Sequence, residues 1–227
     1  MRQGHETPSL EGAAFSRRTQ GLSPRRSGSS AVPLCHYLHF AWAGLIKQGQ
    51  TGGIIPSQRF LIRKMIEPVP SDYRGHLIEL GAGNGALTLR LAAKCPDAHI
   101  LACEINPVLA QDMESNITAA GLAGRAKVVS CSAEHVLSEV IPQKHSKPDY
   151  IISGIPLGNL GRRRAFAFVD LIGHTLAQTG LYVQFQHSLL DRKNLRSCFS
   201  NVRIVPVLFN FPPAVVYYAR QPKCGFR

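Results

Sequence analysis

One acidic residue and three glycines occupy alternate positions in the segment LIELGAGNGALTLRLA, as Glu79, Gly81, Gly83 and Gly85. The run lies where an apolar, strand-like stretch gives way to a helical pattern. Glycines there permit a tight turn and a close approach of the backbone to a ligand. A carboxylate inside such a crevice suits a cationic ligand and would repel a pyrophosphate. The spacing therefore favours S-adenosylmethionine over NAD as the bound cofactor.

A second acid, Glu104 in the segment ACEINP, ends the next apolar stretch. An acid at this distance beyond a glycine turn can accept hydrogen bonds from both ribose hydroxyls of a nucleoside. The alternative is a carboxylate that only stabilises the N-terminus of the following helix. The spacing favours the ligand role.

The segment DYIISGIPLGNL contains a third pattern, in which Ser153, Gly154, Ile155 and Pro156 end another apolar strand. If that strand lies beside the first, its end faces the cofactor, and a transferred methyl group would meet its acceptor there. The alternative is a glycine–proline turn that has no chemical role.

The elements that would position these residues alternate between strands and helices. Strands are expected at 76–80, 99–103, 126–130, 150–153 and 181–187, and helices at 34–47, 58–66, 87–94, 108–120 and 164–176. A closing hairpin at 202–210 and 214–219 follows. This order predicts an α/β, Rossmann-like fold with a mostly parallel sheet, an antiparallel edge hairpin and an N-terminal helical extension.

Composition divides the chain of 227 residues into three expected parts. Residues 1–30 are rich in Ser, Gly, Arg and Pro and predict a disordered basic tail. Residues 31–70 predict a helical segment that contacts membrane or substrate, and 71–227 the cofactor-binding domain. The net charge of +12 indicates an acidic partner, either anionic lipid, nucleic acid or a phosphorylated substrate. The alternative is a surface that is basic only for solubility.

The cysteines and the longest apolar stretch indicate the cellular compartment in which the protein is expected to work. None of the six cysteines forms a C-x-x-C pair, and no Cys/His spacing indicates a metal site. The longest apolar stretch, 31–46, contains His36 and His39 and is shorter than a bilayer-spanning helix. These features predict a reducing, cytoplasmic environment.

Taken together, the motifs resemble the bacterial phospholipid N-methyltransferases, a family of class I methyltransferases that is similar to the ribosomal RNA adenine dimethyltransferases. The likeness covers about residues 45–220, through TGGIIPSQRFLIRKM, LIELGAGNGALTLRLA, EINPVL, DYIISGIPL, LYVQFQHS and FNFPPAVVYYAR. It implies methylation of phosphatidylethanolamine towards phosphatidylcholine, with S-adenosylmethionine as cofactor. It also implies a peripheral position on the inner face of the cell membrane.

The resemblance also implies which residues meet the cofactor and the lipid. The cofactor set is Glu79, Gly81, Gly83 and Gly85 at the methionine end, Glu104, Ile105 and Asn106 at the ribose and adenine, and Ser132, Ala133, Glu134 and Ser153. The substrate set is Ser57, Arg59, Trp42, Ile155 and Pro156. The segment CSAEHV departs from the family, in which Gly-Asp-Ala is frequent, so that Ser132 replaces the acid at the adenine amine.

The acceptor amine must be neutral when it attacks, so a group of the protein is expected to take up its proton. His187 and Tyr37 are the candidates retained, with His36 and His39 as further possibilities and a purely structural histidine as the alternative. A helix at 34–47 with Trp42 could lie in the lipid head-group layer, held by Arg162, Arg163 and Arg164.

Two other functions compete with a phospholipid acceptor. An RNA adenine methyltransferase would suit the charge, but such enzymes stack a flipped base on aromatic residues, and IPLGNL has none. A fold that binds lipid or cofactor without turnover is the non-enzymatic alternative. Another aminolipid, such as an ornithine lipid, remains open as the acceptor.

Overall fold

The computed structural model describes residues 56–142, 147–210 and 212–223, all of which belong to one compact unit. The tail predicted at 1–30 and the helix predicted at 34–47, with Tyr37 and Trp42, lie outside the described residues. Within the described ranges, no helix is long and apolar enough to span a bilayer.

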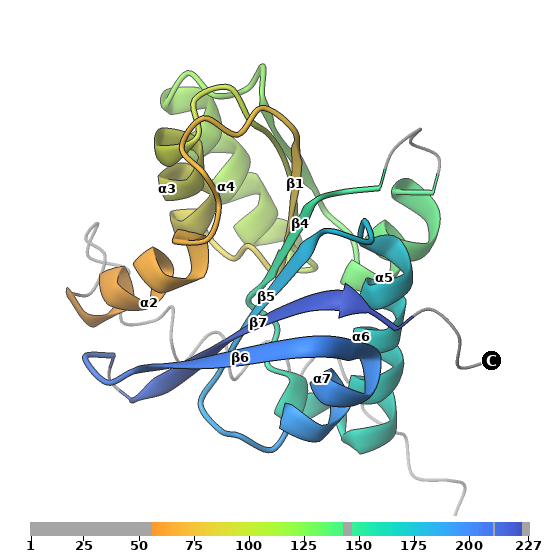
Figure 1. Ribbon diagram of the computed structural model, residues 1–227. Coiled ribbons are helices and arrows are strands. Elements are labelled where there is room, and N and C mark those ends of the chain that lie inside the picture. Colours follow the sequence, from red (N-terminus) through yellow and green to blue (C-terminus); the bar gives the residue numbers. More distant parts are fainter. Residues whose placement is uncertain (1–55, 143–146, 211, 224–227) are drawn as a thin grey trace, which may run out of the picture. The chain divides into compact units, whose positions relative to one another are not determined.

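Seven strands form one sheet in the order β3-β2-β1-β4-β5-β7-β6 (Figure 1). The strands are β1 (His76–Leu80), β2 (His99–Cys103), β3 (Ala126–Val129), β4 (Tyr150–Ser153), β5 (Leu181–Gln186), β6 (Phe199–Val207) and β7 (Ala214–Pro222). The first five are parallel, whereas β7 is antiparallel to β5 and β6. The predicted Rossmann-like sheet with an antiparallel edge pair is confirmed.

Helices cover both faces of this sheet, with α2, α3 and α4 on one face and α5, α6 and α7 on the other (Figure 1). Their bounds are α2 (Pro56–Ile66), α3 (Ala86–Lys94), α4 (Pro107–Ala119), α5 (Ala133–His135), α6 (Arg162–Thr175) and α7 (Arg192–Cys198). A π-helical stretch (Val136–Val140) follows α5, and a 3-10 turn (Leu157–Leu160) precedes α6.

The apolar runs in the sequence reflect burial on both faces of the sheet. In β1, the adjacent residues Leu77 and Ile78 point to opposite faces, and each joins a different core cluster. Helix α2 contributes Leu61 and Met65 to the same cluster as Leu77. Because both faces are covered, the parallel strands contain continuous apolar residues instead of an alternating pattern.

The edge elements differ in detail from the sequence-based expectation. Helix α7 was not predicted, because its seven residues are mostly polar and show no helical period. Strand β6 begins at Phe199 rather than 202, since Phe199 is buried and pairs with Pro222. Helix α6 begins at Arg162 rather than 164, so that the three consecutive arginines form its first turn.

The strand order reverses between β1 and β4, which are neighbours in the sheet. Hydrogen bonds join the carboxyl ends of β1, β2 and β4. The amides of Gly81 and Ala82 donate to the Cys103 carbonyl (2.9 and 3.0 Å), and the Gly154 amide donates to the Leu80 carbonyl (2.9 Å). All three predicted motifs therefore meet at the switch point, where ligands bind in open α/β sheets.

Candidate active site

The glycine turn between β1 and α3 is a bare backbone surface. Gly81, Gly83 and Gly85 have φ values of 72°, 58° and 84°, a region that other residues rarely adopt. A Cβ on Gly81 would lie 2.9 Å from Ile155 Cγ1, and one on Gly85 would lie 2.8 Å from Met113 Cγ. The turn thus needs glycine for its conformation and, at these two positions, for its close contacts.

Glu104 holds the turn from the end of β2. Its buried carboxylate accepts hydrogen bonds from the Gly83 amide (2.8 Å) and the Asn106 amide (2.9 Å), one on each oxygen. A carboxylate oxygen has two lone pairs, so each oxygen can still accept a further donor such as a ribose hydroxyl. The predicted ligand role and a structural role are therefore compatible.

The residues after Glu104 start helix α4. The Asn106 side chain accepts hydrogen bonds from the amides of Val108 (2.9 Å) and Leu109 (3.5 Å) and so caps the helix. Ile105 is exposed and presents an apolar side chain at the same edge. The Asn106 side chain is thus engaged in capping, and Ile105 is the better placed of the two to cover an adenine ring.

Glu79 is buried in β1, between Ala102 of β2 and Ile152 of β4. The Thr88 hydroxyl, from α3, donates a hydrogen bond to its carboxylate. The pKa of Glu79 is raised to about 8, chiefly by burial; the hydrogen bond from Thr88 opposes this shift, and the nearby Glu104 carboxylate adds to it. A cationic ligand beside Glu79 would favour its charged form, which fits the sulfonium and ammonium groups of S-adenosylmethionine.

The turn after β4, residues 153–156, is fixed by buried polar side chains and is called the acceptor-side turn after the role predicted for it from the sequence. The Ser153 hydroxyl accepts a hydrogen bond from the Ile155 amide (3.2 Å). The Ile155 carbonyl accepts hydrogen bonds from the Gln184 (2.9 Å) and Gln186 (3.4 Å) side-chain amides. The buried Tyr182 hydroxyl donates to the Gln184 side-chain oxygen. These bonds hold Ile155 and Pro156 at the edge where the cofactor turn also lies.

Three of these residues were not predicted for the site: Thr88, Gln184 and Gln186. The sequence does contain a signal for the two glutamines. Tyr182, Gln184 and Gln186 occupy alternate positions in an otherwise apolar strand, and all three side chains are buried. Buried polar groups are costly without partners, so polar residues in a buried strand predict a network.

The segment that departs from the family lies at the end of β3. The Ser132 hydroxyl accepts a hydrogen bond from the His135 amide (3.1 Å) and caps the short helix α5, and its own proton can still be donated. Ala133 is buried in the core, and Glu134 is exposed.

His187 follows β5 and is exposed. Its Nδ1 lies 3.0 Å from the Pro213 carbonyl, and its ring meets the Phe185 ring edge-on with centroids 5.6 Å apart. Since a carbonyl can only accept, this contact requires the proton on Nδ1 and leaves a lone pair on Nε2 of the neutral ring.

The predicted substrate residues of α2 lie on the face that α3 also covers. The side chain of Ser57 is outside the described part of the chain, whereas Arg59 is exposed with its guanidinium 5.1 Å from the centre of the Phe60 ring. A cavity of about 470 Å³ lies here, lined by Arg59, Phe60, Arg63, Ile66, Arg90 and Ala93.

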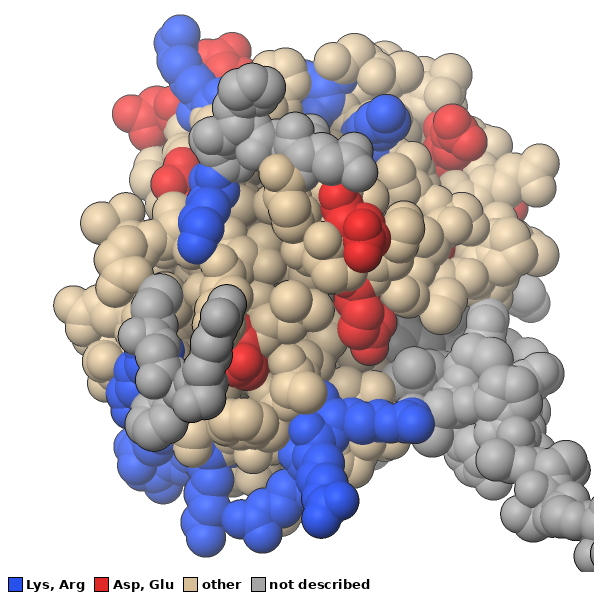
Figure 2. Space-filling view, turned by 90° about the vertical axis from the view of Figure 1, so that its right-hand side faces the viewer, with Lys and Arg blue, Asp and Glu red and all other residues tan. Residues whose placement is uncertain are grey.

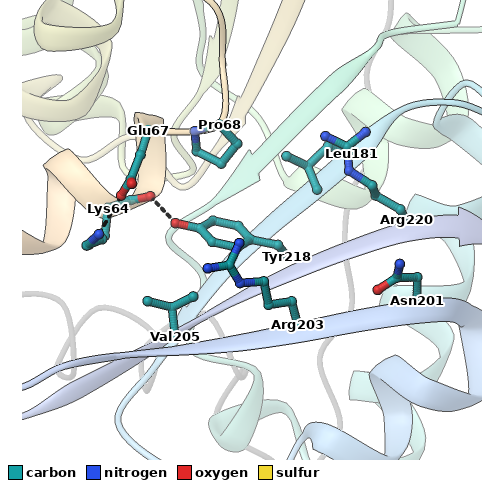
Figure 3. Close-up of a pocket in the computed structure, with 9 residues that line it drawn as sticks. All are labelled: Lys64, Glu67, Pro68, Leu181, Asn201, Arg203, Val205, Tyr218 and Arg220. Carbon is teal, nitrogen blue, oxygen red and sulfur yellow. Dashed lines mark hydrogen bonds and ion pairs between the residues drawn. The ribbon is translucent and has the colours of Figure 1, made fainter.

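Another cavity, of about 310 Å³, lies where α2 meets β5, β6 and β7 (Figure 3). Tyr218 donates a hydrogen bond to the Lys64 carbonyl (2.6 Å), and Lys64 pairs with Glu67 (2.6 Å). Leu181, the first residue of β5, is part of its wall, so this cavity opens at the opposite end of β5 from Gln186 and the predicted site.

Comparisons with known proteins agree with this geometry. Residues 56–208 match the family described as the methyltransferase small domain. An ornithine lipid N-methyltransferase from Singulisphaera acidiphila is 24% identical over 177 residues, which cover 76% of this chain and 90% of that protein.

Solved structures of methyltransferases share the fold. One is the T. thermophilus 16S rRNA N2 G1207 methyltransferase in complex with AdoMet and guanosine, with a TM-score of 0.58 and 22% identity over 75% of this chain. Another is a SAM-dependent methyltransferase from Agrobacterium tumefaciens, with a TM-score of 0.58 and 14% identity over 74% of this chain. The chain spans 44% and 63% of the length of these two structures.

The family match covers most of the chain and includes the glycine turn, Glu104 and the acceptor-side turn. The buried Glu79, the backbone cradle and the partly available Glu104 oxygens fit S-adenosylmethionine, which the family uses. The chain belongs to the methyltransferase small domain family and is an S-adenosylmethionine-dependent methyltransferase.

Proposed function

We propose that the protein methylates the amine of a membrane lipid. The observation that carries this proposal is the similarity to an ornithine lipid N-methyltransferase along nearly the whole of that enzyme. Phosphatidylethanolamine and ornithine lipids both present a primary amine close to a charged head group. Phosphatidylethanolamine is the acceptor that the sequence motifs favour, and the ornithine lipid is the acceptor of the relative.

The acceptor-side turn supports a small aliphatic amine over a flipped base. The turn consists of Ile155 and Pro156, followed by the buried Leu157. Enzymes that methylate a base flipped out of nucleic acid hold it by stacking, for which aromatic side chains offer the largest flat surface. The turn itself offers no aromatic side chain, and the nearby Tyr182 is fully buried and engaged with Gln184.

The residues of the chain would act by positioning and charge. The cofactor supplies a methyl group already activated on a sulfonium. Glu79 and the glycine turn would hold the cationic end, and Glu104 the ribose. The turn at Ile155, fixed by Gln184, would place the acceptor amine, and placement of two reactants is itself a large catalytic factor. His187 Nε2 is the proposed acceptor for the proton that the amine loses.

Methyl transfer to defined acceptors tests this proposal. The purified chain is incubated with labelled S-adenosylmethionine and detergent micelles of phosphatidylethanolamine or of ornithine lipid, or with ribosomal RNA. Lipid and RNA products are then separated and identified by mass spectrometry. We expect methylated lipid from one or both micelles, and no product from the Glu104→Ala variant. Methylation of RNA alone, or of none of the acceptors, would contradict the proposal.

A further inference from the structure

Four large apolar side chains are exposed in two loops at the carboxyl end of β5. Leu189 and Leu190, between β5 and α7, are 54% and 82% exposed, and Leu208 and Phe209, between β6 and β7, are 73% and 78% exposed. Single exposed apolar residues are ordinary, but a group of them marks an interaction site. We propose that these four residues form a docking face for an anionic lipid bilayer.

Two hydrogen bonds tie the segment after β5 to the β6–β7 loop and to β7. His187 Nδ1 meets the Pro213 carbonyl (3.0 Å), and the Tyr217 hydroxyl donates to the Ser188 carbonyl (3.2 Å). The Phe209 ring lies 5.8 Å from the ring of Phe60, a partly exposed residue of α2. The β5–α7 and β6–β7 connections, which are far apart in the sequence, thus lie at the same edge of the sheet (Figure 1).

The docking face lies beside the acceptor-side turn. Gln186, the last residue of β5, contacts the Ile155 carbonyl and pairs with Val215 of β7. The Leu189–Leu190 loop begins directly after β5, and the Leu208–Phe209 loop ends directly before β7. A bilayer in contact with both loops would bring lipid head groups to the edge that contains Ile155, so the inference rests on the proposed lipid acceptor.

Exposed basic residues adjoin one of the two loops in the chain. Arg192, Lys193 and Arg196 of α7 are exposed and follow Leu190 in the chain, whereas the intervening acid, Asp191, is buried. The first turn of α6 adds three exposed arginines. Figure 2 shows lysine and arginine side chains gathered along the lower margin of the molecule, below the acidic residues. Apolar side chains within a basic margin are typical of proteins that insert shallowly into an anionic membrane surface.

RNA is the competing partner for a basic surface of this kind. Phosphate contacts would explain the arginines of α6 and α7, but they give no reason for Leu190 and Leu208 to be so exposed. Insertion into the head-group layer removes leucine side chains from water and therefore explains both the apolar and the basic residues.

Vesicle co-sedimentation tests the docking face with the full chain. Vesicles of phosphatidylcholine with phosphatidylglycerol are compared with phosphatidylcholine alone, at low and high salt. Leu190→Ser combined with Phe209→Ser should lower the partition coefficient on anionic vesicles by roughly tenfold or more at either salt concentration. Arg192→Gln combined with Lys193→Gln should lower it several-fold at low salt and little at high salt.

A matched pair controls for charge. Arg74→Gln combined with Lys127→Gln removes the same charge from exposed positions outside the docking face and should leave vesicle binding nearly unchanged. Unaltered vesicle binding by the Leu190/Phe209 variant would overturn the inference. So would a fall in its thermal midpoint or a change in its oligomeric mass, since a segment of the same chain or a second copy would then cover the face. The inference would also be overturned if the Leu190/Phe209 variant lost its binding to ribosomal RNA but kept its binding to vesicles.

Methyl transfer in two lipid forms separates this inference from the proposed function. The Leu190/Phe209 variant should methylate lipid in detergent micelles at the wild-type rate and lose at least tenfold in rate on vesicles. Equal rates on vesicles, with active wild type, would contradict the docking face alone. Wild type that binds anionic vesicles through this face but methylates no lipid would contradict the proposed function alone.

Discussion

Thr88 and Glu79 form a hydrogen bond in the interior of the protein, with the Thr88 hydroxyl as donor and the Glu79 carboxyl group as acceptor. The donor comes from α3 and the acceptor from β1, so the bond spans the glycine turn that both elements share. This hydrogen bond partly offsets the effect of burial, and the net pKa of the Glu79 carboxyl group is about 8. Two pH-dependent properties of the protein follow from this carboxyl group.

The first property is stability. A carboxyl group in the unfolded chain ionises near pH 4.5, whereas Glu79 in the folded protein ionises near pH 8. Between these values the unfolded chain binds fewer protons, so the free energy of unfolding falls as the pH rises. Glu79→Gln removes this loss and should stabilise the cofactor-free protein by roughly 4 kcal/mol at pH 8, and hardly at pH 4.

Denaturant unfolding of both proteins between pH 4 and pH 8 measures the difference. Glu114→Gln is the control, because it makes the same substitution at an exposed position on α4. A Glu79→Gln variant that is less stable than wild type at pH 8 would show that the carboxyl group is already charged in the folded protein.

The second property is cofactor affinity. A cation beside Glu79 favours the charged carboxylate, so binding at pH 7 should release a proton from this group. Affinity should then rise with pH up to about 8, the pKa in the free protein, and level off above it. Calorimetry in two buffers of different ionisation enthalpy detects the released proton. Glu79→Gln should abolish the release and weaken binding, while any proton from the cofactor's own amine persists in both proteins.

Gly81 and Gly121 allow a matched test of the cradle. Both have left-handed φ values, 72° and 69°, but a Cβ on Gly81 meets Ile155 whereas one on Gly121 meets nothing within 4 Å. The left-handed conformation alone should make alanine cost about 1–2 kcal/mol of stability at either position, and the contact with Ile155 adds to this cost at Gly81. Only Gly81→Ala should also lower the affinity for S-adenosylmethionine, by about tenfold or more, as measured by calorimetry. Equal affinities in the two variants would mean that the turn does not contact the cofactor.

Gln184 is predicted to be a positioning residue for the acceptor. Gln184→Leu leaves the Ile155 carbonyl without this donor and should lower kcat for lipid methylation by roughly tenfold or more, with cofactor affinity unchanged. Tyr182→Phe is the control, since it removes a bond to Gln184 but keeps the contact with Ile155. It should cost about 1 kcal/mol of stability and little activity. Equal kcat losses in both variants would indicate a general packing defect.

His187 can be tested by two substitutions that separate its possible roles. His187→Gln retains a side-chain donor for the Pro213 carbonyl but cannot accept the proton of the substrate amine. His187→Ala removes both properties. If Nε2 is the proton acceptor, both variants should lose activity to a similar extent, and the dependence of kcat on pH should change. Activity restored in His187→Gln would instead assign the residue to holding the loop.

The proximity of the glycine turn and Glu104 could be predicted because each motif is local in the sequence. Gly81, Gly83 and Gly85 form one local turn, and Glu104 ends the next strand, so strand ends alone place them together. Thr88 could not be paired with Glu79 in advance, because the pairing depends on the rotation of α3 about its axis. Local sequence contains no such information.

The acceptor half depends on long-range pairing. The contact between Gln184 and Ile155 requires the β4–β5 register, in which Ser153 pairs with Gln184. The contact between Phe60 and Phe209 requires α2 and the β6–β7 turn to meet at one edge. Periodicity predicted the strands but neither their register nor the path of the loops, and α7 was too short and polar to be seen at all.

The position of β7 between β5 and β6 has a consequence for synthesis on the ribosome. Strand β5 is buried along its whole length, yet its neighbour on one side is β7, which follows β6 in the chain. While the nascent chain lacks β7, β5 has an unpaired apolar edge of the kind that promotes aggregation. The cofactor-binding strands have their partners earlier. During translation the strands that precede the glycine turn and Glu104 should therefore pair first. A chaperone that shields β5 would act before β7 completes the sheet.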